Sequence, residues 1–178
     1  MKILLPALAL VAVTACSNNE TSDTRSSISV TARPSKVSLT AADLDGFEKG
    51  LTEEIRLVKE GQARAARATT ATERGNAINS TFEENTTKEA IPKSGLTFDR
   101  YHMVRDLMSR LLTTLDFQDK IPGPQSVDTS LADSAMKARL RSDPYDELDA
   151  ASAALVKARL DRIAPLWIEY VKLTIAGG

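Results

Sequence analysis

The sequence of 178 residues predicts an all-α fold, a bundle of four or five helices over residues 40–178. Three observations lead to this prediction. Apolar residues recur at steps of three and four in several segments, which is the period of a helix and not of a strand. Residues that cap helices precede these segments. The chain also shows no internal repeat, no glycine-rich phosphate loop and no convincing strand, so helices packed on helices are the architecture that remains.

The first predicted helix begins at a capping signal. Thr40 is of a type that caps helices, and Asp43 follows three residues later, as in a capping box. Leu39 and Leu44 flank this pair at the spacing of a hydrophobic staple. The apolar positions that follow share one stripe of the helix: Leu44, Phe47, Leu51, Ile55 and Val58.

A second helical stretch is predicted from about Ala71 to Ala90, after the apolar pattern thins to alanines beyond Gly61. Its large apolar side chains, Ile78 and Phe82, are expected to face inward. The stretch is polar and rich in Thr and Asn. The sequence therefore leaves open whether it continues the first helix or folds back on it.

The most regular helix of the sequence follows Pro92 and Gly95, which are expected to break the chain. Thr97 can cap this helix, and the segment Ile121–Pro124 ends it. Its apolar stripe is the cleanest in the chain and consists of Phe98, Tyr101, Val104, Leu107, Met108, Leu111, Leu112 and Leu115.

Two further helices are predicted towards the C-terminus. A short one runs from about Thr129 to Arg141. The last begins at Asp143-Pro144, where a capping residue precedes a proline at the first helical position. Pro165 lies inside this last helix and is expected to kink or split it. One face of the helix is apolar, with Trp167 beside it: Leu148, Leu155, Ile163, Leu166, Tyr170 and Leu173.

The N-terminal residues have the order of a secretory signal. Lys2 precedes an apolar run of about 11 residues, and small residues then lead to Cys16, the only cysteine. This segment resembles the lipobox of bacterial lipoproteins, which implies that residues 1–15 are a signal peptide and that Cys16 is acylated after cleavage. The apolar run is too short for a transmembrane helix, which needs about 20 residues.

The resemblance also implies a location. We expect residues 16–39 to form a lipidated, disordered tether, because the Ser, Thr and Asn in it bury too little surface to offset their ordering entropy. In enteric bacteria, an aspartate after the lipidated cysteine marks an inner-membrane lipoprotein. This chain has Ser17 at that position, which resembles the signal for the outer membrane. The domain would then face the periplasm and contact the membrane only through its lipid.

Composition excludes several classes of function. The chain carries 23 basic and 24 acidic residues, a formal net charge of −1. This balance supplies neither the basic surface that nucleic acid requires nor a polybasic patch for a membrane. Because no second cysteine exists, a hydrophobic core must stabilise the domain without disulfides.

The residue sets that carry catalysis are missing. His102 is the only histidine, and zinc or iron sites need more ligands than it supplies. With Asp99 and Asp106 beside it, it is predicted to lie on a solvated helix face. The domain has no thiol and no Gly-x-Ser-x-Gly elbow. We therefore expect no enzyme, no metal and no cofactor. Nor does spacing select an acid and a base among the carboxylates of the first half: Glu53, Glu54, Glu83, Glu84 and Glu89.

Three residues of the last helix are candidates for binding a partner. Arg159 lies near the middle of the apolar stripe, where it either snorkels to solvent or pairs with an acid of this chain or of a partner. Trp167 and Tyr170 concentrate aromatic surface, which interfaces favour. A single tryptophan is also what the core of a small domain needs first.

Arginines towards the end of the first helix form a second charged feature. Arg64, Arg67 and Arg74 make a small basic ridge. Glu60 and Glu73 interleave with it, so we expect solvated side chains here.

These features together predict a non-enzymatic protein-binding module. The lipoprotein would act as an inhibitor, as an immunity protein that neutralises an incoming toxin, or as an adaptor, with another envelope or incoming protein as its partner. One alternative is a structural or assembly subunit of an envelope complex, and another is a carrier of a small apolar ligand between the helices. An exposed apolar patch beside Trp167 would favour protein binding, whereas a closed apolar cavity would favour a carrier.

Overall fold

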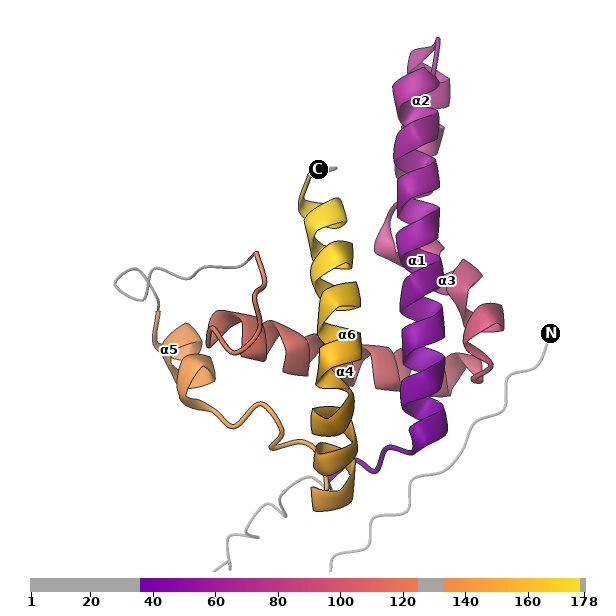
Figure 1. Cartoon of the computed structure of the whole chain (residues 1–178). Coiled ribbons are helices and arrows are strands. Elements are labelled where there is room, and N and C mark those ends of the chain that lie inside the picture. The colour runs from indigo at the N-terminus through magenta and orange to yellow at the C-terminus, as the bar shows by residue number, and fades with distance from the viewer. Residues whose placement is uncertain (1–35, 125–132, 177–178) are drawn as a thin grey trace, which may run out of the picture. The chain divides into compact units, whose positions relative to one another are not determined.

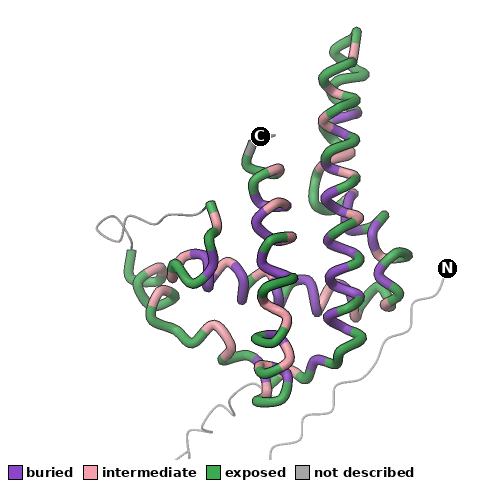
Figure 2. Tube along the Cα trace, viewed as in Figure 1, coloured by how far each residue is buried: buried purple, intermediate pink, exposed green. Residues whose placement is uncertain are grey.

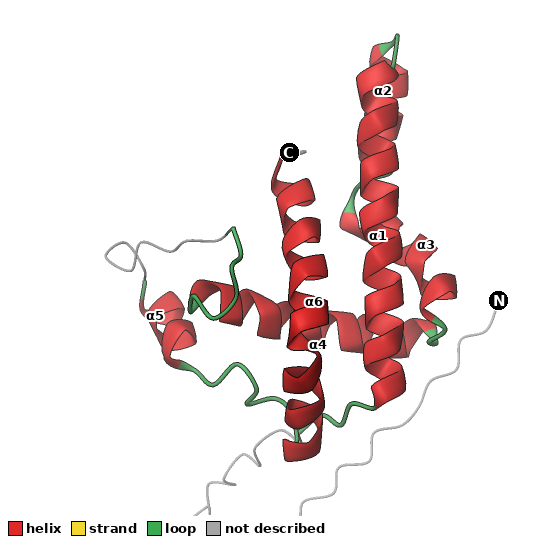
Figure 3. Ribbon diagram, viewed as in Figure 1, coloured by secondary structure: helices red, strands yellow, loops and turns green. Residues whose placement is uncertain are grey.

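The computed structural model describes residues 36–124 and 133–176, which form six helices and no strand (Figures 1 and 3). This confirms the all-α class, with more helices than the four or five predicted. The predicted signal peptide, Cys16 and the tether up to residue 35 lie outside the described residues. The helices are α1 (Ala41–Arg67), α2 (Ala71–Asn79), α3 (Glu83–Ser94), α4 (Phe98–Phe117), α5 (Ser134–Arg141) and α6 (Ala150–Ala176).

Helix α1 begins as predicted. The Thr40 hydroxyl accepts a hydrogen bond from the Asp43 backbone N–H at 3.2 Å, and the Asp43 carboxylate accepts one from the Thr40 N–H at 2.7 Å, which completes a capping box. The predicted stripe is buried in a core built from α1, α4 and α6. Buried positions follow the first two thirds of α1 and become sparse towards α2 (Figure 2).

The second predicted stretch is two helices. The chain turns over residues 80–82, and both α2 and α3 fold back on α1. The inward orientation predicted for Ile78 and Phe82 is wrong, since they are 38% and 57% exposed. Large side chains at the turn point outward because α3 packs on α1 through smaller ones: Thr86, Thr87, Ala90 and Ser94.

The junction between α3 and α4 lies later than predicted. Pro92 does not break the chain but sits in the last turn of α3. Gly95 ends that helix in a left-handed conformation with φ 74°, which glycine adopts without steric cost. Thr97 caps α4 as predicted, accepting from the Arg100 N–H at 3.3 Å. Phe98 was expected in the stripe of α4, but it is exposed.

Helix α4 crosses α1 closely (Figure 1). At the crossing a glycine is required, because a Cβ on Gly50 would lie 2.2 Å from the hydroxyl of the fully buried Tyr101. The rest of the predicted α4 stripe, from Tyr101 to Leu115, is buried. The helix ends at Phe117, four residues before Ile121, which joins the core as part of the following loop.

The start of α6 differs from the prediction. Asp143-Pro144 opens a turn, closed by a hydrogen bond from the Asp146 N–H to the Asp143 carbonyl at 3.1 Å. The helix begins only at Ala150, where the Asp149 carboxylate accepts from the backbone of the first turn. Between this turn and the helix, Leu148 pairs with Val37 in a parallel bridge. The bridge uses backbone groups that a helix would need for its own hydrogen bonds.

Residues 37–39, predicted as the end of the disordered tether, pack against this same region. The Leu39 N–H donates to the Ser152 hydroxyl at 2.7 Å, and the Leu39 side chain is buried. The helical domain therefore includes residues before Thr40.

Helix α6 runs through Pro165 as one helix, so of the two predicted effects of this proline the split is wrong and the kink stays a prediction. Its buried face includes Val156, Ile163, Trp167 and Tyr170, while Leu155, Leu166 and Leu173 are only half-buried. Helix α5 buries no residue, and the first turn predicted for it falls outside the described residues. Within 36–124 and 133–176, no helix is both long enough and apolar enough to cross a bilayer.

Candidate functional site

The three residues predicted to bind a partner do not share an exposed surface. Trp167 and Tyr170 are buried in the core, with ring centroids 6.0 Å apart. Arg159 lies at the α1–α6 contact and forms ion pairs with Asp45 and, at 3.5 Å, with Glu48. Neither aromatic ring presents its surface to a partner, and the arginine is paired within its own chain.

A buried polar cluster lies beside Tyr170. Glu54 of α1 is fully buried, and Arg105 of α4 is 4% exposed. Nε and Nη2 of Arg105 donate to the two oxygens of Glu54 at 2.8 and 2.7 Å, which is a bidentate pair. The Tyr101 hydroxyl donates to the same carboxylate at 2.8 Å. The negative charge of Glu54 on α1 is thus balanced by Arg105 on α4 inside the core.

Arg105 also joins this cluster to α3 and α6. Its Nη2 donates to the Tyr170 hydroxyl at 3.0 Å, and its Nη1 donates to Glu83 at 2.6 Å. The guanidinium carbon lies 5.5 Å from the centroid of the Tyr170 ring, within the range of a cation–π contact. One arginine therefore links four helices.

The electrostatics of the cluster keep its hydroxyls protonated. Burial, reinforced by the negative charge of Glu54, raises the pKa of Tyr101 well above its usual value. Burial also raises the pKa of Tyr170 to about 12, against the opposing effect of the Arg105 charge. Burial opposes the charge on Arg105, but hydrogen bonds to Glu54 outweigh it and raise the arginine pKa. At neutral pH these groups bind and orient, and they do not exchange protons.

Sequence reasoning missed Glu54 and Arg105, although a signal for both exists. Glu54 stands three residues after Leu51 and four before Val58, inside the apolar stripe of α1. Arg105 holds the same kind of position between Tyr101 and Met108 on α4. A carboxylate and a guanidinium that interrupt two buried stripes indicate a buried pair, because neither is stable alone in a core.

A cleft of about 200 Å³ opens beside the cluster. It lies between α1, the α2–α3 turn and the C-terminal half of α6, and its lining includes Val58, Gln62, Phe82, Glu83, Tyr170 and Leu173. The turn approaches α1 closely here, since a Cβ on Gly61 would lie 2.3 Å from the Thr81 methyl group.

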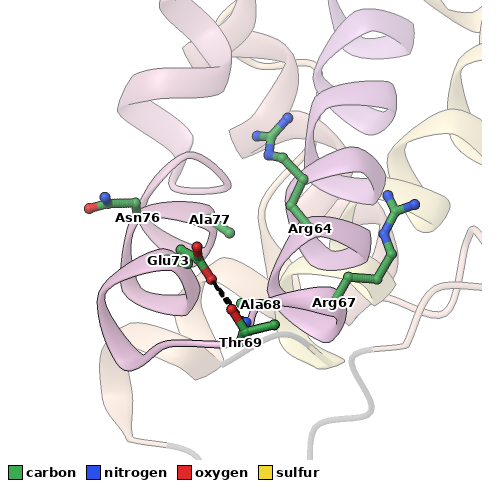
Figure 4. Close-up of a pocket in the computed structure, with 7 residues that line it drawn as sticks. All are labelled: Arg64, Arg67, Ala68, Thr69, Glu73, Asn76 and Ala77. Carbon is green, nitrogen blue, oxygen red and sulfur yellow. Dashed lines mark hydrogen bonds between the residues drawn. The ribbon is translucent and has the colours of Figure 1, made fainter.

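A wider hollow of about 590 Å³ lies between the C-terminal turns of α1 and helix α2 (Figure 4). Arg64 and Arg67 both line it, and their side chains run back along α1 with the guanidinium groups apart from each other. Arg64 donates to the Ser80 hydroxyl at 2.7 Å, and Arg67 donates to the Ala63 carbonyl at 3.1 Å. Within the described part of the chain neither guanidinium has a carboxylate partner. The rest of the lining is Ala68, Thr69, Glu73, Asn76 and Ala77.

The two acids expected to balance these arginines are engaged elsewhere. Glu60 pairs with Arg56, which lies one turn before it on α1. Glu73 completes the capping box of α2, accepting from the backbone N–H groups of Thr69 and Thr70 at 2.9 and 3.1 Å. These hydrogen bonds, with that of the Thr69 hydroxyl, hold the pKa of Glu73 below its usual value. Interleaving along the sequence therefore does not neutralise the arginines in the fold.

The remaining candidates stand apart. Across residues 36–124 and 133–176, no three His, Cys, Asp or Glu side chains gather so that they could hold a metal ion. His102 is half-buried, with its ring 4.3 Å from that of Phe98. No family model, curated protein or solved structure matches this chain.

Proposed function

We propose that this chain is a periplasm-facing lipoprotein, anchored in the outer membrane through Cys16, whose helical domain binds another protein without catalysing a reaction. The anchor rests on the lipobox-like segment described above. The observation that carries the binding function is the pair Arg64 and Arg67, exposed beside the hollow of Figure 4 with no carboxylate partner in the described residues.

The chemistry of this surface selects an acidic segment of a partner protein. Each guanidinium offers several N–H donors in a fork that matches a carboxylate. The alanines Ala68 and Ala77 give the hollow an apolar floor. The chain as a whole is nearly neutral, so the positive charge is local, and local charge complementarity steers one partner and rejects others. Inhibitors, immunity proteins and adaptors all require such selective recognition.

The alternative, a permanent subunit of an envelope complex, is favoured by a different surface. A hollow of about 640 Å³ runs along α6, and its lining is mainly apolar: Pro122, Pro165, Ile168, Leu173 and the side chains of Glu169 and Lys172. Permanent interfaces are more apolar than transient ones. This hollow and the arginine pair are separate surfaces, so variants can distinguish the two functions.

The proposal is tested by crosslinking the anchored full chain in intact cells and identifying what it captures. Arg67→Glu should reduce capture of the bound protein roughly tenfold, which corresponds to about 1.4 kcal/mol. Arg74→Glu makes the same charge change on α2, outside the residues that line the hollow, and should leave capture unchanged. Equal capture by both variants would contradict binding through this surface.

The anchor is tested separately. Cys16→Ser should release the protein from the membrane fraction, because acylation requires the thiol. Continued membrane association of that variant would refute the lipoprotein assignment. The anchored protein should capture its partner through Arg67. If the released Cys16→Ser protein does not capture that partner, the anchor brings the domain to it.

A further inference from the structure

The cleft beside Arg105 points to a second binding site, which does not depend on the arginine pair of the proposed function. We infer that it binds a small apolar carboxylate. The carboxylate of the ligand takes the place of Glu83 on Nη1 of Arg105, and its apolar group lies against Val58 and Leu173.

The two sides of the Arg105 guanidinium have different roles. Nε and Nη2 contact the fully buried Glu54, which holds the guanidinium in place. Nη1 is directed to Glu83, a residue that lines the cleft, at 2.6 Å. The Nη1 group of Arg105 therefore already binds a carboxylate, which the chain itself supplies as Glu83.

Glu83 is suited to exchange. Its side chain is 66% exposed, whereas that of Glu54 is fully buried. Glu54 keeps Arg105 paired when Glu83 moves, and a ligand carboxylate restores the hydrogen bond at Nη1, so exchanging one carboxylate for another leaves the buried pair intact. Phe82, at the N-cap of α3, makes no side-chain capping bond that movement of Glu83 would break. Together the arginine and the two glutamates carry a charge of −1, so a ligand carboxylate replaces Glu83 and does not join it.

The lining of the cleft selects the rest of the ligand. Val58 and Leu173 are apolar, and the ring of Phe82 stays more than half exposed at the rim. Such a ring can cover a bound apolar group. With a volume of about 200 Å³ the cleft is smaller than sites for drug-sized molecules, so it fits a chain of roughly six carbons.

Trp167 provides the readout for a test on the full chain. It is the only tryptophan, and its ring packs against Tyr170, whose hydroxyl contacts Arg105. Hexanoate at millimolar concentrations should change Trp167 fluorescence and shift the Nε–H resonance of Arg105, while neutral hexanamide of the same shape should not. Glu83→Gln removes the internal carboxylate and should tighten hexanoate binding about tenfold.

Glu84→Gln is the matched control, because it removes the same charge from the next, exposed residue of α3. It should leave hexanoate binding unchanged, and so should Arg67→Glu. Equal binding of hexanoate and hexanamide, equal effects of the two glutamine variants, or no binding to Glu83→Gln would each overturn the inference. None of these outcomes bears on protein capture through Arg64 and Arg67.

Discussion

The two ends of α1 belong to regions of opposite character. Up to Val58 the helix contributes large apolar side chains and Glu54 to the core shared with α4 and α6. We call this region the base. Beyond Gly61 the same helix carries alanines and exposed arginines, and the partner helix α2 buries only Ala77. We call residues 61–79 the tip (Figures 1 and 2).

This difference separates the part that stabilises the domain from the part that we propose recognises a partner. In the base, charged groups are buried and paired, so a change there removes folding free energy. In the tip, the arginines are solvated and have no carboxylate partner in the described residues, so a change of their charge should cost little folding free energy. Local capping supports the tip, through the Thr70–Glu73 box at the start of α2.

The largest expected effect tests the buried pair of the base. Glu54→Gln keeps the shape of the side chain but leaves Arg105 buried beside a neutral group, and we expect a loss of about 3–5 kcal/mol in the free energy of unfolding. Glu60→Gln makes the same change at an exposed ion pair and should cost less than about 1 kcal/mol. Urea denaturation measures both. A similar loss of unfolding free energy for the two variants would show that the buried pair of the base stabilises the domain no more than an exposed ion pair does.

A smaller effect is expected from added methyl groups. Gly50→Ala places a Cβ against the buried Tyr101 ring and should destabilise the domain by about 3 kcal/mol. Gly75→Ala in α2 meets no atom within 4 Å and should stabilise it by about 0.5–1 kcal/mol through helix propensity. Thermal unfolding of the two variants shows whether each change raises or lowers the stability of the domain. Destabilisation by Gly75→Ala would indicate that the tip is packed as tightly as the base.

The smallest effect is expected from acid. Hydrogen bonds from Arg100, at 2.6 and 2.7 Å, lower the pKa of Asp43 to about 2 from an ordinary value near 3.8. Because the folded state holds the proton less tightly, this stabilisation is present above about pH 4 and is lost as the pH falls towards 2. It amounts to about 2 kcal/mol.

Two variants compare base and tip in unfolding experiments from pH 2 to pH 6. Asp43→Asn should flatten the acid dependence of the free energy of unfolding. Glu73→Gln should change it less, since the pKa of Glu73 is lowered by hydrogen bonds at the exposed tip. A larger change for Glu73→Gln would mean that the tip contributes more to acid stability than the base.

Local patterns predicted the fold where the chain is strongly periodic. The Thr40 box, the stripes of α1 and α4, and the cap at Thr97 all follow from spacing and side-chain type, which act within a few residues. The prediction was incomplete at residues 71–90, where the helical stretch is divided by a turn, and wrong at 143–149, where no helix begins. There the path of the chain depends on α3 packing against α1 and on Val37 pairing with Leu148, both of which are contacts between distant segments.

The candidate sites show the same division. The sequence by itself determined the helix periods, the caps at Thr40 and Thr97, and the lipobox-like segment at Cys16, because each depends on neighbouring residues. Only the tertiary structure decided that Glu54 meets Arg105, that Trp167 and Tyr170 are buried, and that Arg64 and Arg67 meet no carboxylate among the described residues. Which charges meet depends on how helices cross in space, and one-dimensional spacing does not contain those distances.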